Sequence, residues 1–211
     1  MEARPSGSIP PIETGGAHGY DGTHKGDGNM GVRLKTWTRD EYDRLVAAGA
    51  FAPGARVQLV LGEIVEMTPQ SAAHVTGVRL VQQRLEAVFT SGYDVRVQFP
   101  LALSADSEPE PDVAVVRGTA RDYSRQHPTA AVLVVEVADS TLRFDQGPKA
   151  VMYARAAIGE YWILNLEGRV LEVYREPQPS GYAAVTVVRP EESISPQAAP
   201  GARIRVLDLL P

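Results

Sequence analysis

The sequence predicts an α/β domain in which helices cover both faces of a mixed β-sheet. Segments with helical periodicity alternate with strand-like runs, in the order helix, hairpin, helix, three strands, helix and further strands. The run AVLVVEVAD, residues 131–139, is apolar almost throughout, which is typical of a central strand buried on both faces. The chain has 211 residues, of which 44% are hydrophobic, so one domain with a sizeable core is expected.

Residues 1–35 are expected to form a disordered N-terminal tail, which leaves residues 36–211 for the folded domain. The first thirty residues are rich in Gly and Pro and contain few large apolar side chains. Such a segment cannot bury enough surface to offset the entropy lost on ordering. Translation could start at Met1 or at Met30, and the sequence leaves both open.

The N-terminal part of the domain is predicted to contain a short helix and a hairpin. Residues 38–49 form the helix, because Thr38 and Glu41 have the spacing of a capping box. Residues 56–67 alternate between apolar and polar side chains around Leu61 and the glycine that follows it, which predicts a hairpin.

The longest predicted helix covers residues 71–92 and is followed by a strand. Five apolar residues of this helix form one stripe: Val75, Val78, Val81, Leu85 and Val88. Residues 93–101 are a strand that places Val95, Val97 and Phe99 on one face.

The second half of the chain is predicted to be mainly β. A helix over residues 147–157, with Pro148 near its first turn, separates two groups of strands. The predicted strands are residues 111–116, 131–139, 160–166, 170–176, 181–188 and 203–209.

Glu136 places a charge inside the most apolar strand of the chain. Since side chains alternate along a strand, Val132, Val134 and Glu136 share a face. A shift of the strand that turned Glu136 to solvent would not bury a more favourable set of side chains in its place. A buried carboxylate without a partner is strongly unfavourable or takes up a proton. We therefore expect Glu136 to be paired, protonated or bound to a cation.

Asp112 is the expected neighbour of Glu136, because it opens the preceding strand directly after a proline. Two carboxylates held together repel each other, and a divalent cation with a preference for hard oxygen ligands, Mg²⁺ or Mn²⁺, relieves this repulsion. Taken singly, Asp112 could be a strand-entry turn residue and Glu136 a member of a structural salt bridge.

Lys149 falls in the first turn of the predicted helix, where a cation opposes the helix dipole. If it points back to the carboxylates, it can orient a water molecule or offset charge on a phosphoryl transition state. The alternative is a solvated surface lysine. Asp145, four residues earlier, could cap the helix or tether Lys149.

Several segments together carry a family resemblance: LVLGEIVEMTP, AAHVTGVRLVQQRL, EPDVAVV and VLVVEVADSTLRFDQGPKAVMYARAAIGEYWIL. They resemble the Uma family of restriction-endonuclease-like proteins, within the PD-(D/E)XK nuclease superfamily, over about residues 36–190. The resemblance implies a three-layer α/β/α restriction-endonuclease-like core with a mixed β-sheet and a magnesium-dependent phosphodiesterase site.

The resemblance also implies roles for individual residues. Asp112 and Glu136 match the metal ligands of the motif. Ala138 stands where the general motif has its lysine, and Lys149 of the following helix would supply that lysine instead. Glu63 matches a family position that lines the same cleft, and it is expected to be a further catalytic residue.

Three further residues are candidate substrate contacts. His74 could approach the cleft from the long helix as a base or phosphate contact, Arg143 could contact the nucleic-acid backbone, and Tyr153 could stack on a base. The alternatives are a boundary histidine, a solvated arginine and a core tyrosine.

We therefore expect a metal-dependent endonuclease that hydrolyses phosphodiester bonds of nucleic acid, with DNA as substrate and Mg²⁺ or Mn²⁺ as cofactor. Two alternatives remain: a catalytically inactive nuclease fold that binds nucleic acid or protein, and an enzyme of different chemistry on the same carboxylate pair. The formal net charge of −5 requires phosphate contacts to come from a local patch or a bridging metal.

The remaining expectations concern the setting of the protein. The chain contains no cysteine, which fits a reducing cytoplasm, and no apolar run approaches the roughly 18 residues that a membrane helix needs. The late strands 181–188 and 203–209 leave open a homodimer through sheet or surface contacts.

Overall fold

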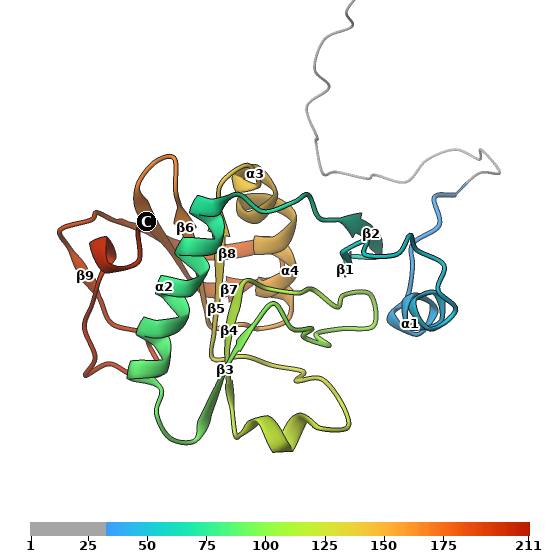
Figure 1. Cartoon of the computed structure of the whole chain (residues 1–211), viewed down its shortest axis with the longest axis horizontal. Coiled ribbons are helices and arrows are strands. Elements are labelled where there is room, and N and C mark those ends of the chain that lie inside the picture. The colour runs from blue at the N-terminus through green and yellow to red at the C-terminus, as the bar shows by residue number, and fades with distance from the viewer. Residues whose placement is uncertain (1–32) are drawn as a thin grey trace, which may run out of the picture. The chain divides into compact units, whose positions relative to one another are not determined.

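The fold is that of a computed structural model, which describes residues 33–211 (Figure 1). Residues 1–32 of the predicted disordered tail therefore lie outside the described part of the chain. Lys35–Pro211 form one compact unit. No helix within residues 33–211 combines the length and apolar character that crossing a bilayer requires.

A six-stranded mixed sheet forms the centre of this unit (Figure 1). Its strand order is β3-β4-β5-β6-β7-β8, with β5 and β6 parallel and the other neighbours antiparallel. The strands are β3 (Tyr93–Val97), β4 (Val113–Arg117), β5 (Leu133–Ala138), β6 (Glu160–Asn165), β7 (Val170–Gln178) and β8 (Gly181–Val188).

Helices cover both faces of the sheet, which confirms the predicted three-layer α/β/α architecture (Figure 1). Helix α2 (Ala72–Val88) packs on one face, and α4 (Ala150–Arg155) packs on the other. The side chains of β5 alternate between them, so Val135 and Val137 face α2, whereas Val134 and Ala138 face α4. Glu136 therefore points to the α4 side.

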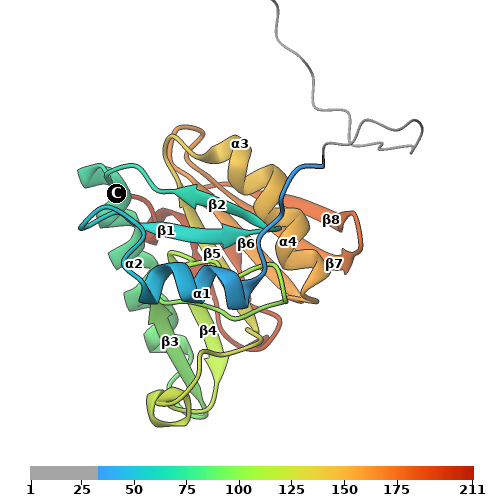
Figure 2. The ribbon, with the colours of Figure 1, turned by 90° about the vertical axis from the view of Figure 1, so that its right-hand side faces the viewer.

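The N-terminal helix and hairpin lie on the α4 side of the sheet (Figure 2). They comprise α1 (Arg39–Ala47), β1 (Val57–Val60) and β2 (Glu63–Glu66). The capping box of Thr38 and Glu41 is present, as the sequence predicts. Leu61 and Gly62 both have positive φ angles, 51° and 81°, which are the conformations that a tight hairpin turn needs.

Two side chains that the sequence predicts on an apolar face, in the helix before residue 92 and in the strand after it, are exposed in the structure. Val75 belongs to the predicted stripe of α2 but is 45% exposed, because the buried side of the helix is centred on Gly77 and Val81 and Val75 lies away from it. Phe99 is 56% exposed, because β3 ends at Val97 and Gln98 takes a left-handed backbone conformation with φ 54°.

The helix predicted over residues 147–157 begins earlier than expected. It runs through α3 (Leu142–Phe144), the π-helical turn η2 (Asp145–Lys149) and α4 without a break. Pro148 lies inside this helix, and Ala150, two residues after it, donates its N–H to Asp145 O in the π pattern. A proline has no N–H for the α-helical ladder, and the wider turn accommodates that loss.

The C-terminal strand prediction is also only partly correct. Of residues 203–209, only β10 (Ile204–Arg205) is a strand, and it pairs with β9 (Ser193–Ile194) outside the main sheet. The chain then forms the short helix η3 (Val206–Asp208), whose Val206 joins the core beneath α2. One further short helix, η1 (Ala120–Tyr123), follows β4.

Gly77 brings α2 unusually close to the sheet, and its replacement tests this contact. A Cβ atom at Gly77 would lie 2.9 Å from Val137 Cγ1. Because that valine is held in the central strand, we expect Gly77→Ala to lower the free energy of unfolding by about 1–3 kcal/mol. Urea unfolding followed by circular dichroism measures the change.

Gly147→Ala is the matched control within a helix, because its added Cβ would have no neighbour within 4 Å. This variant should unfold at the wild-type urea concentration or slightly above it. Equal unfolding midpoints for the two variants would contradict the proposed packing limit at Gly77.

Candidate active site

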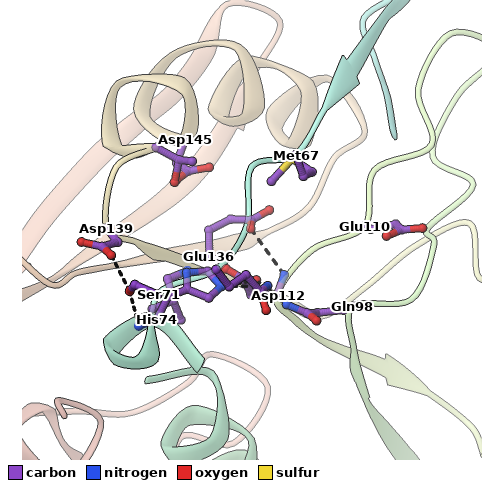
Figure 3. A network of polar contacts seen from close by, with 12 residues as sticks. Met67, Ser71, His74, Gln98, Glu110, Asp112, Glu136, Asp139 and Asp145 are labelled. Atoms are coloured by element: carbon purple, nitrogen blue, oxygen red, sulfur yellow. Dashed lines mark hydrogen bonds and ion pairs between the residues drawn. The ribbon is translucent and has the colours of Figure 1, made fainter. Parts of the chain in front are cut away.

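The antiparallel pairing of β4 with β5 brings Asp112 beside Glu136. Val113 pairs with Val135, so Asp112, one residue before Val113, lies opposite Glu136, one residue after Val135. The Asp112 N–H lies 3.4 Å from Glu136 Oε2, and Asp112 Oδ2 accepts a hydrogen bond of 2.8 Å from Val137 N–H. The carboxylate of Asp112 is thereby fixed to the backbone of β5. Figure 3 shows Asp112 beside Glu136.

Glu136 has two further partners, both from the helix that crosses this face. Lys149 Nζ lies 2.8 Å from Glu136 Oε1, and Tyr153 donates its hydroxyl to the same oxygen at 2.7 Å. Glu136 and Lys149 are each only 2% exposed. The burial of Lys149 excludes the alternative of a solvated surface lysine.

The position of Lys149 differs from the prediction, because it does not lie in the first turn of its helix. It lies at the end of the π-helical turn, where Asp145 is four residues earlier on the same side. Lys149 Nζ is 3.4 Å from Asp145 Oδ1, and Thr141 donates its hydroxyl to Asp145 Oδ2 at 2.6 Å. Asp145 therefore tethers the lysine, which is one of the two roles considered from sequence.

Asp112 is also held from its other side, by His74 of α2 and by Gln98 (Figure 3). His74 Nε2 lies 3.1 Å from Asp112 Oδ1, and Gln98 Nε2 donates to the same oxygen at 3.2 Å. The sequence reasoning missed Gln98. Its place directly after β3, which pairs with β4 beside Asp112, is the signal that points to it.

Asp112, Glu136, Lys149 and His74 line a cleft of about 210 Å³. The segment that leads into α2, residues 67–71, forms a further wall, and Arg56 also lines the cleft. On another side lies Asp139, which accepts a hydrogen bond of 2.6 Å from Ser71. The buried charges are thus reached from one solvent-accessible hollow.

The other predicted site residues occupy different positions. Glu63 is exposed on β2 and does not line the cleft, so the structure does not bring it to the predicted catalytic group. Arg143 is exposed and lines an adjoining hollow that shares Asp139 with the cleft. Tyr153 is completely buried, so it supports Glu136 from below and does not present a face for a base to stack on.

The charges of the site shift one another's pKa values. Burial, together with the charges of Asp112 and Asp145, raises the pKa of Glu136 to about 7 against the opposing attraction of Lys149. Burial alone would lower the pKa of Lys149, but the surrounding carboxylates outweigh it and raise that pKa. Likewise, burial would raise the pKa of Asp112, but the hydrogen bond and charge of His74 lower it. Negative charge is therefore in excess around the lysine.

The donor set fits a magnesium or manganese ion. Within residues 33–211, no group of three or more His, Asp or Glu side chains is arranged to hold a metal. However, proteins usually bind Mg²⁺ through one or two carboxylates, and water and substrate phosphate fill the other positions. Asp112 and Glu136 offer two hard oxygen donors beside each other at the cleft, and a cation there would relieve the excess negative charge.

A mixed sheet covered by helices on both faces, with two carboxylates and a lysine at one cleft, is the arrangement expected of a restriction-endonuclease-like protein. The sequence model of the Uma2 family, described as "Putative restriction endonuclease", matches residues 39–207. The chain therefore belongs to the Uma2 family.

Two solved structures are similar to this chain. A putative nuclease belonging to DUF820 from Anabaena variabilis ATCC 29413 has a TM-score of 0.64 at 15% identity, covering 82% of this chain and 96% of that chain. The type IIG restriction endonuclease BpuSI gives a TM-score of 0.33 at 17% identity, over 48% of this chain and 11% of that chain. No curated protein matches.

The hydroxyl of Tyr153 supports the buried charge of Glu136, and its removal tests this support. Tyr153→Phe leaves a buried carboxylate with one donor fewer, so we expect the free energy of unfolding to fall by about 1.5–3 kcal/mol. The midpoint of urea unfolding, measured at a pH above the pKa of about 7 of Glu136 so that the carboxylate is ionised, gives the loss.

Tyr182→Phe is the control, because Tyr182 donates to a neutral acceptor, the carbonyl of Ile158, at 2.9 Å. Its loss should be smaller, about 0.5–1.5 kcal/mol. A Tyr153→Phe variant as stable as wild type would show that Glu136 does not depend on this donor.

Proposed function

We propose that this Uma2 protein is a metal-dependent endonuclease that hydrolyses phosphodiester bonds of DNA. One observation carries the proposal, namely that Asp112, Glu136 and Lys149 meet at the floor of a single cleft. Family membership supports the nuclease class, whereas the metal and the DNA substrate are inferred from the chemistry of the site.

Asp112 and Glu136 would hold Mg²⁺ or Mn²⁺ through their carboxylate oxygens. When bound, the ion supplies a Lewis acid that lowers the pKa of water and stabilises charge on the phosphate oxygens. The hydrogen bonds from Val137, His74 and Gln98 keep Asp112 in one orientation, so its oxygen donors are preorganised.

Lys149 contributes a positive charge that is fixed in place by burial. Its raised pKa keeps the ammonium group protonated at neutral pH, so it can donate to a water molecule or to a phosphate oxygen at the cleft. Because the group is held by its helix and by two carboxylates, little reorganisation is needed when negative charge develops on the phosphate.

Two arginines can contact the nucleic-acid backbone next to the scissile phosphate. Arg56 lines the cleft, and Arg143 lines the adjoining hollow, which shares Asp139, Ser140 and Thr141 with the cleft. Phosphate contacts of this kind position a nucleic acid without reading its sequence. They provide local positive charge on a chain whose net charge is −5.

Cleavage of plasmid DNA, single-stranded DNA and RNA with Mg²⁺ or Mn²⁺ tests the proposal. We expect cleavage of DNA that a chelator abolishes and that falls by about 10²–10⁴-fold in both Glu136→Gln and Lys149→Ala. Circular dichroism of each variant establishes that the loss does not come from unfolding.

Glu63→Gln and Glu66→Gln serve as controls, because both glutamates are exposed on β2 and neither lines the cleft. They should cleave at the wild-type rate. Cleavage that survives in Glu136→Gln would contradict the proposed site, cleavage of RNA alone would contradict the proposed substrate, and binding of DNA without cleavage would support an inactive binding module.

A further inference from the structure

Asp145 lies beside Lys149, and the mechanism proposed above uses it only as one of the two carboxylates that hold the ammonium group. Its side chain is 2% exposed, and Thr141 donates to its Oδ2. The other oxygen, Oδ1, is buried and accepts no hydrogen bond within the described part of the chain. Buried polar atoms usually have a partner, so an acceptor left open beside an ammonium group needs an explanation.

The backbone of Asp145 is held firmly in its position. Its carbonyl accepts a hydrogen bond from Ala150 N–H within the π-helical turn and a second one, of 3.1 Å, from the buried hydroxyl of Tyr161. Asp145 and Lys149 therefore stay on the same side of one turn. Lys149 Nζ lies between two carboxylates, at 2.8 Å from Glu136 and at 3.4 Å from Asp145.

A metal ion on Glu136 would compete with Lys149 for the same carboxylate. Glu136 Oε1 accepts from both Lys149 and Tyr153, while Oε2 faces the N–H of Asp112. A divalent cation and an ammonium group repel each other in a buried site. The ammonium group must then weaken its contact with Glu136, and it cannot remain unpaired in the interior without a large desolvation cost.

We infer that Asp145 is a positioning residue that accepts the ammonium group of Lys149 in place of Glu136 when a metal ion binds to Glu136. The open Oδ1 atom would receive the ammonium group after a shift of a few tenths of an ångström, and Lys149 would stay at the floor of the cleft. This inference rests on the proposed metal site. It explains why a second buried carboxylate, that of Asp145, lies close to Lys149, although Lys149 is already paired with Glu136.

Calorimetric titration of the full-length protein with Mn²⁺ tests the inference without requiring catalysis. We compare wild type, Asp145→Asn, Lys149→Met and the double variant, each checked for folding by circular dichroism. Asp145→Asn should weaken Mn²⁺ binding by about 10- to 100-fold, as loss of a supporting residue does. In the Lys149→Met background the same change should have little effect, because no ammonium group remains to be received.

Asp139→Asn is the matched control, because Asp139 is a carboxylate of the same cleft that contacts Ser71 and not Lys149. It should bind Mn²⁺ with wild-type affinity. An equal loss in Asp139→Asn, or an equal loss from Asp145→Asn with and without Lys149, would mean that Asp145 acts only through its general negative potential, and this would overturn the inference.

A crystal structure of the wild-type protein with Mn²⁺ gives a second test that needs no variant to fold. We expect Lys149 Nζ to lie within hydrogen-bond distance of Asp145 Oδ1 and farther from Glu136 Oε1 than the present 2.8 Å. Mn²⁺ bound with Lys149 still on Glu136 would overturn the inference alone and leave the nuclease proposal intact. A wild-type protein that binds no Mn²⁺ would overturn both.

Discussion

The buried ion pair of Glu136 and Lys149 is the constraint on which the arrangement of this protein depends. A carboxylate in the middle of the central strand is tolerable only if a cation and further donors reach it, and Lys149 and Tyr153 reach it from the same crossover helix. The helix must therefore lie on this face of β5, at this height and in this rotation. Within the π-helical turn, Asp145 and Lys149 lie next to each other on the same side of the helix.

The two faces of β5 divide the molecule into a part that provides stability and a part that provides chemistry. On the α2 side, Val135 and Val137 belong to a mainly apolar core, and Gly77 allows the helix to approach closely. On the α4 side, the apolar residues surround a cluster of charges that opens to the cleft. The rigid apolar side thus holds the backbone that positions the charged side, which is a common requirement for a preorganised site.

Much of this arrangement could be predicted from the sequence, because local patterns determine it. Strand alternation identified Glu136 as a buried charge, and the neighbouring strand identified Asp112 as its companion. The π-helical turn could not be predicted, since Pro148 near a glycine is normally a helix start and only tertiary packing keeps it inside a helix. Gln98 was missed for a similar reason: it belongs to no motif, and it reaches Asp112 only through the pairing of β3 with β4.

The parallel pairing of β5 with β6 has a consequence for how the protein folds. Parallel neighbours cannot be joined by a tight turn, so the segment between Ala138 and Glu160 must complete its crossover before the two strands pair. That segment carries Lys149 and Tyr153, and Glu136 has neither partner until the crossover has docked. A chain folded only as far as the β3-β4-β5 sheet would expose an uncompensated acid in a hydrophobic strand. Docking of the crossover is therefore the step at which the charge cluster forms.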